Sequence, residues 1–83
     1  MAKLTIDRMP CTSGMDTMKI TGFENGELSE LKSMDHYESK EKLLDMLDNR
    51  NSGQGTIWTC GVGVFGHWFD NEAAYINIGK SAD

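Results

Sequence analysis

The length of the chain limits its fold more than any single motif does. A chain of 83 residues is expected to form one domain, residues 1–83, because hydrophobic cores rarely divide below about 250 residues. A domain of this size buries only about 60% of the surface that its unfolded chain exposes. Doubly wound nucleotide-binding domains, kinases and large barrels therefore do not fit.

The N-terminal residues do not resemble an export signal. Met1 to Pro10 alternates Leu4 and Ile6 with polar residues, whereas a secretory signal needs a run of about seven or more apolar residues. No stretch approaches the roughly 20 apolar residues of a membrane span. The chain is therefore predicted to be cytoplasmic, with no membrane partner. In a reducing cytosol Cys11 and Cys60 are expected to be free thiols, with a disulfide between them as the alternative.

Two segments near the N-terminus have the pattern of strands. Residues Met1–Arg8 alternate apolar and polar side chains, which predicts a short strand. Farther along, Asn25-Gly26 is typical of a two-residue hairpin turn. It predicts a hairpin of Thr17–Phe23 against Glu27–Ser33, with a bulge near Gly22 because the two apolar faces are out of register. The competing interpretation is a helix with an apolar stripe of Leu28, Leu31 and Met34.

The segment Tyr37–Asp48 has the clearest helical periodicity in the chain. Its apolar stripe consists of Leu43, Leu44 and Leu47. Ser39 suits the N-cap position, and the Asn, Ser and Gly residues of Asn49–Gly55 suit a helix end and a loop. The sequence predicts a helix of about ten residues with one buried face.

The last third of the chain predicts a second hairpin. Thr56–Phe69 is rich in β-branched and aromatic residues and too rich in glycine for a helix. Asp70-Asn71 supplies a turn before Ala73–Gly79. Pairing of Phe69 with Glu72 sets the register. One face of this hairpin is then expected to carry Trp58, Cys60, Val62, Val64, Trp68 and Tyr75.

Together these segments predict an α+β fold. We expect a small antiparallel sheet of four to five strands in two hairpins, with one helix packed on one face. The chain order is β-β-α-β-β, with room for an extra N-terminal strand. Because one helix covers one face, the other face of the sheet should stay open.

No motif predicts catalysis or a cofactor. Gly61–Gly66 spells G-x-G-x-x-G, but the residues after it have a strand-like pattern instead of a helical one, and a position 20 past Gly66 falls outside the given sequence. A zinc site is not expected, since the spacing is wrong for Cys11, His36, Cys60 and His67. Strand alternation would put Cys60 and His67 on opposite faces, with a core thiol and a surface imidazole. We expect no metal, no cofactor and no enzyme, with a thiol-dependent activity of Cys60 as the enzymatic alternative.

The negative charge lies in one segment. The formal net charge is −5, and residues 24–48 hold eight carboxylates against three lysines, whereas acids and bases balance elsewhere. Direct nucleic-acid binding is not expected, because phosphate contacts need basic side chains. An acidic surface suits a basic protein partner, and the alternative is a solvated face that favours solubility. The predicted partner-binding residues are Glu24, Glu27, Glu30, Asp35, Glu38, Glu41, Asp45 and Asp48.

A second predicted surface is aromatic. Trp58, Trp68 and Tyr75 should lie on the uncovered face of the C-terminal hairpin, and an apolar patch there would mark an interface with a partner or a second copy. Alternatively, the N-terminal segment folds over these rings with Leu4, Ile6 and Met9. The chain is accordingly expected to be a monomer or a homodimer.

No family motif is recognised in the sequence. In size, acidity, α+β outline and lack of a catalytic signature, the whole chain resembles the inhibitors that phages and other mobile elements carry against bacterial defence nucleases, including anti-CRISPR proteins. No specific residues carry this resemblance. It implies a nucleic-acid mimic that occupies the basic surface of a nucleic-acid-binding protein or nuclease complex. The structural alternative is a homodimeric module built on the aromatic hairpin.

Overall fold

The structure, a computed structural model, describes residues 2–10 and 14–79. In chain order its elements are β1 (Thr5–Met9), β2 (Met15–Thr21), α1 (Glu27–Ser33), α2 (His36–Arg50), α3 (Gln54–Gly61), β3 (Val64–Phe69) and β4 (Ala74–Gly79). The four strands form one antiparallel sheet in the order β1-β2-β4-β3. The α+β prediction is thus confirmed, and the N-terminal strand is one of these four.

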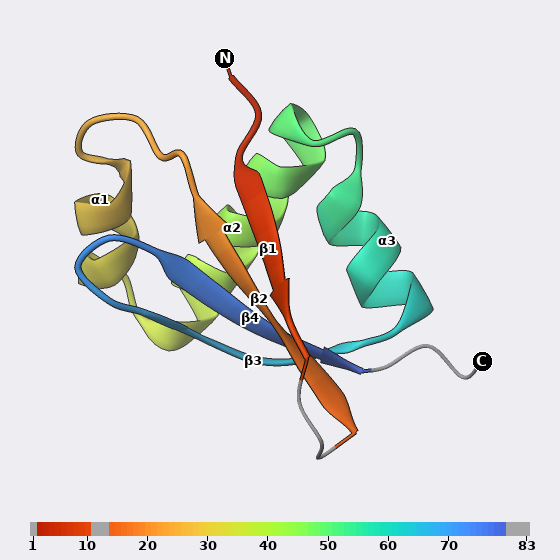
Figure 1. Cartoon of the computed structure of the whole chain (residues 1–83). Helices are drawn as coiled ribbons and strands as arrows, with labels where there is room; N and C mark the ends of the chain where they lie inside the picture. The colour runs from red at the N-terminus through yellow and green to blue at the C-terminus, as the bar shows by residue number, and fades with distance from the viewer. Residues whose placement is uncertain (1, 11–13, 80–83) are drawn as a thin grey trace.

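The three helices lie on one face of the sheet (Figure 1). Alternate residues of the two central strands face these helices and are buried: Asp16, Met18, Ile20, Ala74, Ile76 and Ile78. The core continues into the helices through Leu31, Leu43, Leu47 and Trp58. Among the described residues no helix covers the opposite face of the sheet, as expected (Figure 1).

The prediction that Glu27–Ser33 is a strand is wrong, because this segment is α1. Gly26 has a φ of 85° and is the N-cap of the helix instead of a hairpin turn residue. The helical alternative accounts for the packing, since Leu31 is only 1% exposed and Leu28 packs against the core. Asn25-Gly26 is compatible with a hairpin turn and with the start of a helix. Burial of the apolar stripe of Leu28, Leu31 and Met34 favours the helix.

The strand predicted for Thr56–Phe69 is also shorter than expected. Its first part belongs to α3, and only Val64–Phe69 is a strand. Gly55 brings α3 close to α2, since a Cβ there would lie 2.4 Å from the Leu44 carbonyl oxygen. Trp58 then enters the core. Tertiary packing overrides the strand propensity of this segment, so three helices replace the single one that was predicted.

Helix α2 is longer than the predicted helix and begins earlier. Its N-cap is Asp35, whose side chain accepts a hydrogen bond from the Glu38 N–H at 2.8 Å. Ser39, the predicted N-cap, lies inside the helix and is 2% exposed. Both residues are good caps, and Asp35 is preferred because the helix then gains one further turn.

The C-terminal hairpin has a different register from the predicted one. Phe69 pairs with Ala74 instead of Glu72, because Asp70 closes a longer turn by accepting hydrogen bonds from the Glu72 and Ala73 N–H groups. The shift of two positions preserves the alternation of faces. The bulge lies between Val64 and Gly66, whereas β1 and β2 pair continuously up to Thr21, without the bulge expected near Gly22.

Strand β1 lies at the edge of the sheet opposite β3. Leu4 is buried and Ile6 packs against the core, while Met9 is 47% exposed. The N-terminal segment therefore does not fold over the aromatic residues of β3. Within the part of the chain that the structure describes, no helix is long and apolar enough to cross a membrane.

Candidate functional site

Two of the eight predicted binding carboxylates hold the fold together. Glu27 forms a bidentate pair with Arg50, and Glu24 lies 3.6 Å from the same guanidinium. The Arg50 side chain is only 4% exposed, so this pair ties the start of α1 to the end of α2. The hydrogen bond from Arg50 lowers the pKa of Glu27. A carboxylate committed to an internal arginine is a poor contact for a partner.

Three further carboxylates also have internal roles. Asp35 caps α2, and Asp48 accepts hydrogen bonds from the N–H and the hydroxyl of Thr56 at 2.7 and 2.8 Å, which fixes the start of α3. Glu30 lies 3.8 Å from Lys42 in an exposed ion pair. The structure therefore divides the acidic segment into carboxylates that build the fold and carboxylates that face solvent.

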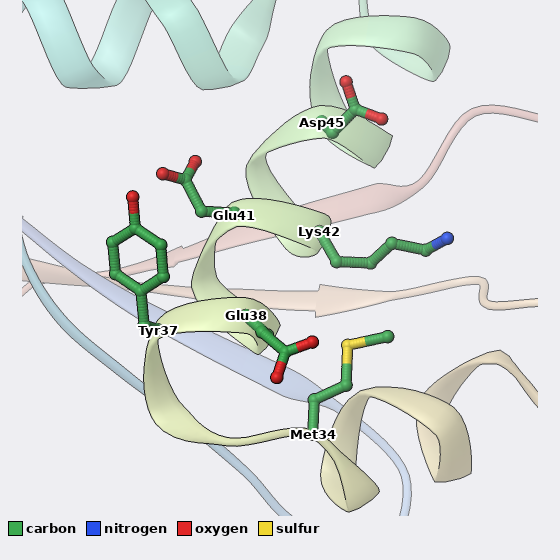
Figure 2. Close-up of a pocket in the computed structure, with 6 residues that line it drawn as sticks. All are labelled: Met34, Tyr37, Glu38, Glu41, Lys42 and Asp45. Carbon is green, nitrogen blue, oxygen red and sulfur yellow. The ribbon is translucent and has the colours of Figure 1, made fainter.

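The remaining three, Glu38, Glu41 and Asp45, form one stripe along the exposed side of α2 (Figure 2). Spacings of three and four residues place them on one helical face, opposite the buried Leu43 and Leu47. Within residues 2–10 and 14–79, none of the three is in a salt bridge. They line a shallow groove together with Met34, Tyr37 and Lys42. We call this the acidic groove.

Neighbouring groups perturb the titration of the acidic groove. The pKa of Tyr37 is raised because its hydroxyl is hydrogen-bonded to the Glu41 carboxylate, whose charge opposes ionisation. The pKa of Glu38 is raised by its hydrogen bond with Asp35 and by repulsion from that carboxylate. Tyr37 itself is 69% exposed. The groove thus presents negative charge beside an accessible aromatic ring, a combination that suits a cationic side chain.

The predicted aromatic surface is only partly assembled. Trp58 is 7% exposed and lies in the core, so its assignment to the surface is wrong. Trp68 and Tyr75 do lie together on the face without helices, with their rings stacked at 5.2 Å and 8°. Trp68 is 43% exposed and Phe65 of the same edge strand is 66% exposed. The aromatic pair of Trp68 and Tyr75 remains as an apolar feature of this face.

The predicted locations of Cys60 and His67 are reversed in the structure. Cys60 is an exposed thiol near the end of α3, because Thr56–Phe69 does not form one continuous strand. It shares a groove with Glu41, Asp45 and Asp48, and Lys40 is the only cation that lines this groove within the described chain. Cys11, the other predicted thiol, lies outside the described residues.

A cluster around His67 was not recognised as a site from the sequence. His67 is 8% exposed, its Nε2 lies 2.8 Å from the Ser39 hydroxyl, and its ring lies 4.3 Å from that of His36. Ser39 lies four residues before Leu43, on the buried face of α2. That spacing was the sequence signal that Ser39 would be buried and could contact another element. Ser39 is too deeply buried to act as an accessible nucleophile. Over the described ranges no three metal-ligating side chains come together.

Comparisons with known proteins found no family model, no curated protein and no solved structure that matches this chain.

Proposed function

We propose that this protein is a non-enzymatic binding protein that inhibits or modulates a nucleic-acid-handling protein by occupying its basic surface. The binding surface is the acidic groove of α2, narrower than the eight carboxylates of the sequence prediction. The observation that carries the proposal is the stripe of Glu38, Glu41 and Asp45, which has no internal salt bridge in the described chain. These charges are available to a partner.

The fixed geometry of the stripe supports a role as a mimic of a phosphate backbone, although its charges are more widely spaced than phosphates. Neighbouring carboxylates are separated by about 4.5 and 6 Å along the helix axis, compared with about 3.4 Å per phosphate along one DNA strand. The stripe lies on a helix whose opposite face is buried, so its geometry is largely set before binding. Preorganised charge lowers the entropic cost of association.

Side chains next to the stripe would add contacts that a phosphate backbone lacks. Tyr37 offers an exposed ring to an arginine guanidinium, and Met34 offers an adaptable apolar contact. The expected partner surface is therefore rich in arginine and normally contacts nucleic acid. Such binding should weaken as salt is raised, because the interacting charges are exposed.

A double substitution tests this proposal. Glu38→Gln with Asp45→Asn should weaken binding to the partner by about three- to thirtyfold, because each lost charge contact costs about 0.3–1 kcal/mol and both lie on one surface. Binding would be measured by biolayer interferometry against a panel of purified nucleases and nucleic-acid-binding proteins, at low and high salt. A DNA fragment should compete for the same site, and nuclease activity should fall as this protein is added.

The matched control is Asp7→Asn with Glu72→Gln. Both residues are exposed and lie outside α2, and the control removes the same number of charges. It should leave affinity within about twofold. If the two variants lost binding equally, the effect would come from net charge alone, and a specific site on α2 would be contradicted. A partner affinity that did not change with salt concentration would also contradict the proposal.

The aromatic pair of Trp68 and Tyr75 supports a second candidate, a homodimer formed through the face without helices. Exposed Phe65 and Trp68 lie on edge strand β3, which contains no Asp, Glu, Lys or Arg, so two copies could meet along this edge, with Lys19 beside Tyr75 as a charged neighbour. Sedimentation equilibrium should then show a dimer at tens of micromolar protein, and Trp68→Ala should weaken it at least tenfold. Ile57→Ala, at another exposed apolar residue, should not. A wild-type protein that stays monomeric in this range contradicts the homodimer.

A further inference from the structure

A second depression lies on the other side of the start of α2 from the acidic groove. It is formed where the end of α1, the first turns of α2 and strand β3 meet. Its lining is Leu31, Lys32, Met34, His36, Ser39, His67, Trp68 and Phe69. We call it the histidine pocket. No described carboxylate lines it, although the net charge of the chain is −5.

A hydrogen bond orients the His67 ring and leaves its other nitrogen buried without a partner among the described residues. Its Nε2 lies 2.8 Å from the Ser39 hydroxyl, and that hydroxyl oxygen lies 3.2 Å from the His36 carbonyl oxygen. If the hydroxyl donates to the carbonyl, Nε2–H donates to the hydroxyl oxygen. The other nitrogen, Nδ1, is buried and has no hydrogen-bond partner among the described residues. A buried polar atom without a partner is costly unless a ligand supplies one.

Basic groups from both helices line the histidine pocket or lie near His67. Lys32 comes from α1 and is held by a hydrogen bond to the Asn71 side chain at 3.1 Å. From α2 come His36, whose ring packs on that of His67, and Lys40. Asp35, which precedes His36 in the sequence, uses its carboxylate to cap α2, and the residue of β4 that pairs with His67 is the apolar Ile76.

We infer that the histidine pocket binds a small oxyanion, and that the His67 ring takes up a proton when the anion binds. In the bound state Nδ1–H donates to the anion, Nε2–H to the Ser39 hydroxyl, and that hydroxyl to the His36 carbonyl. Each polar hydrogen of the ring then has an acceptor. Lys32 supplies a second positive charge at the rim.

Proton uptake follows from the environment of the ring. Burial, together with the proximity of His36 and Lys40, lowers the pKa of His67 in the free protein. The ring is therefore neutral at pH 7. A bound anion raises the pKa of His67, because a nearby negative charge favours the protonated imidazolium. By linkage, the anion must bind more tightly as the pH falls towards the pKa of the free protein.

The alternatives for this cluster fit the geometry less well. The two imidazole rings lie 4.3 Å apart and tilted by 31°, no group of three ligating side chains occurs among the described residues, and Lys32 in the pocket lining opposes a dication. Hydrolytic chemistry would need an accessible Ser39, which is 2% exposed. An anion instead uses the buried nitrogen and the positive charges together.

The test is a titration of the full chain with sulfate and, separately, with acetate at constant ionic strength. Sulfate keeps its charge over the pH range used, so any pH dependence comes from the protein. The His67 ring resonances in NMR spectra should shift and saturate, and the dissociation constant should fall up to tenfold per pH unit as the pH is lowered from 8. Saturation by sulfate identifies a phosphate-like ligand, and saturation by acetate alone identifies a carboxylate.

Lys32→Gln is the informative variant, because its side chain is exposed and its loss should not affect folding. It should weaken the saturating anion at least threefold, whereas Lys3→Gln, the same change at an exposed lysine outside the pocket, should not. The proposal is overturned if neither anion gives a saturable shift of His67, or if the two lysine variants weaken binding equally.

Discussion

Arg50→Met should lower the free energy of unfolding by about 3 kcal/mol. The Arg50 side chain is almost fully buried and bridges Glu27 and Glu24. Methionine keeps much of the apolar stem but leaves Glu27, whose side chain is 23% exposed, without its buried cation. Removing one partner of a buried pair costs more than the pair contributes, because the other partner remains partly desolvated. Urea unfolding at pH 7 measures the loss.

The same variant has a defined pH signature. Arg50 lowers the pKa of Glu27 in the folded state. A carboxylate with a lowered pKa contributes stability above its unfolded pKa, and this contribution disappears as the pH falls through the folded pKa. The difference between wild type and variant should therefore be complete at neutral pH and shrink below about pH 4. A difference that grew in acid would contradict this account.

Lys42→Met is the matched control for the arginine. It removes an ion pair whose two side chains are 47% and 57% exposed, and it should change stability by no more than about 0.5 kcal/mol. If both substitutions had the same effect, the bridge between α1 and α2 would be no stronger than a surface ion pair.

Gly55→Ala should destabilise the protein by about 2–3 kcal/mol, although alanine is the better helix former. The added Cβ would lie 2.4 Å from the Leu44 carbonyl oxygen and 3.1 Å from a carboxylate oxygen of Asp48. The Leu44 carbonyl belongs to the backbone of α2 and cannot turn away from the new Cβ as a side chain could. Helix α3 must therefore shift away from α2. That movement would also strain the two hydrogen bonds between Asp48 and Thr56. Thermal and urea unfolding would both report the loss.

Gly61→Ala provides the comparison within the same helix. Gly61 ends α3, and a Cβ there would meet no atom within 4 Å. This substitution should be neutral or stabilising by up to about 1 kcal/mol. If Gly55→Ala were equally harmless, the close contact between α2 and α3 would not be a constraint on the fold.

Elements with one strong local signal could be predicted from the sequence. The N-terminal strand and α2 follow from alternation and from the leucine stripe, and the presence of a C-terminal hairpin, but not its register or the start of its first strand, follows from the turn signal. The segments Glu27–Ser33 and Gln54–Gly61 could not be assigned in the same way. Each has local preferences compatible with two structures, and burial of Leu31 and Trp58 against other elements decides between them.

The acidic site could be located in the sequence only as a region. A count of charges identifies Glu24–Asp48 but does not distinguish a carboxylate that caps a helix from one that faces solvent. That distinction depends on residues far along the chain, such as Arg50 for Glu27 and Thr56 for Asp48. The His67 cluster needs contact between α2 and β3, which no local pattern encodes.

The central pairing of β2 with β4 has a consequence for how the chain folds. The Thr17 hydroxyl donates to the Asn77 side chain across sixty residues, and all three helices lie between these two strands in the sequence. The loop must close before any contact along this seam forms, and contacts of such high order slow folding. The β1–β2 hairpin and the helices can form locally and early. We therefore expect docking of β4 to be the late step that joins both halves of the sheet, and a fragment without β4 to lack the strand that pairs with β2 beside Met18 and Ile20.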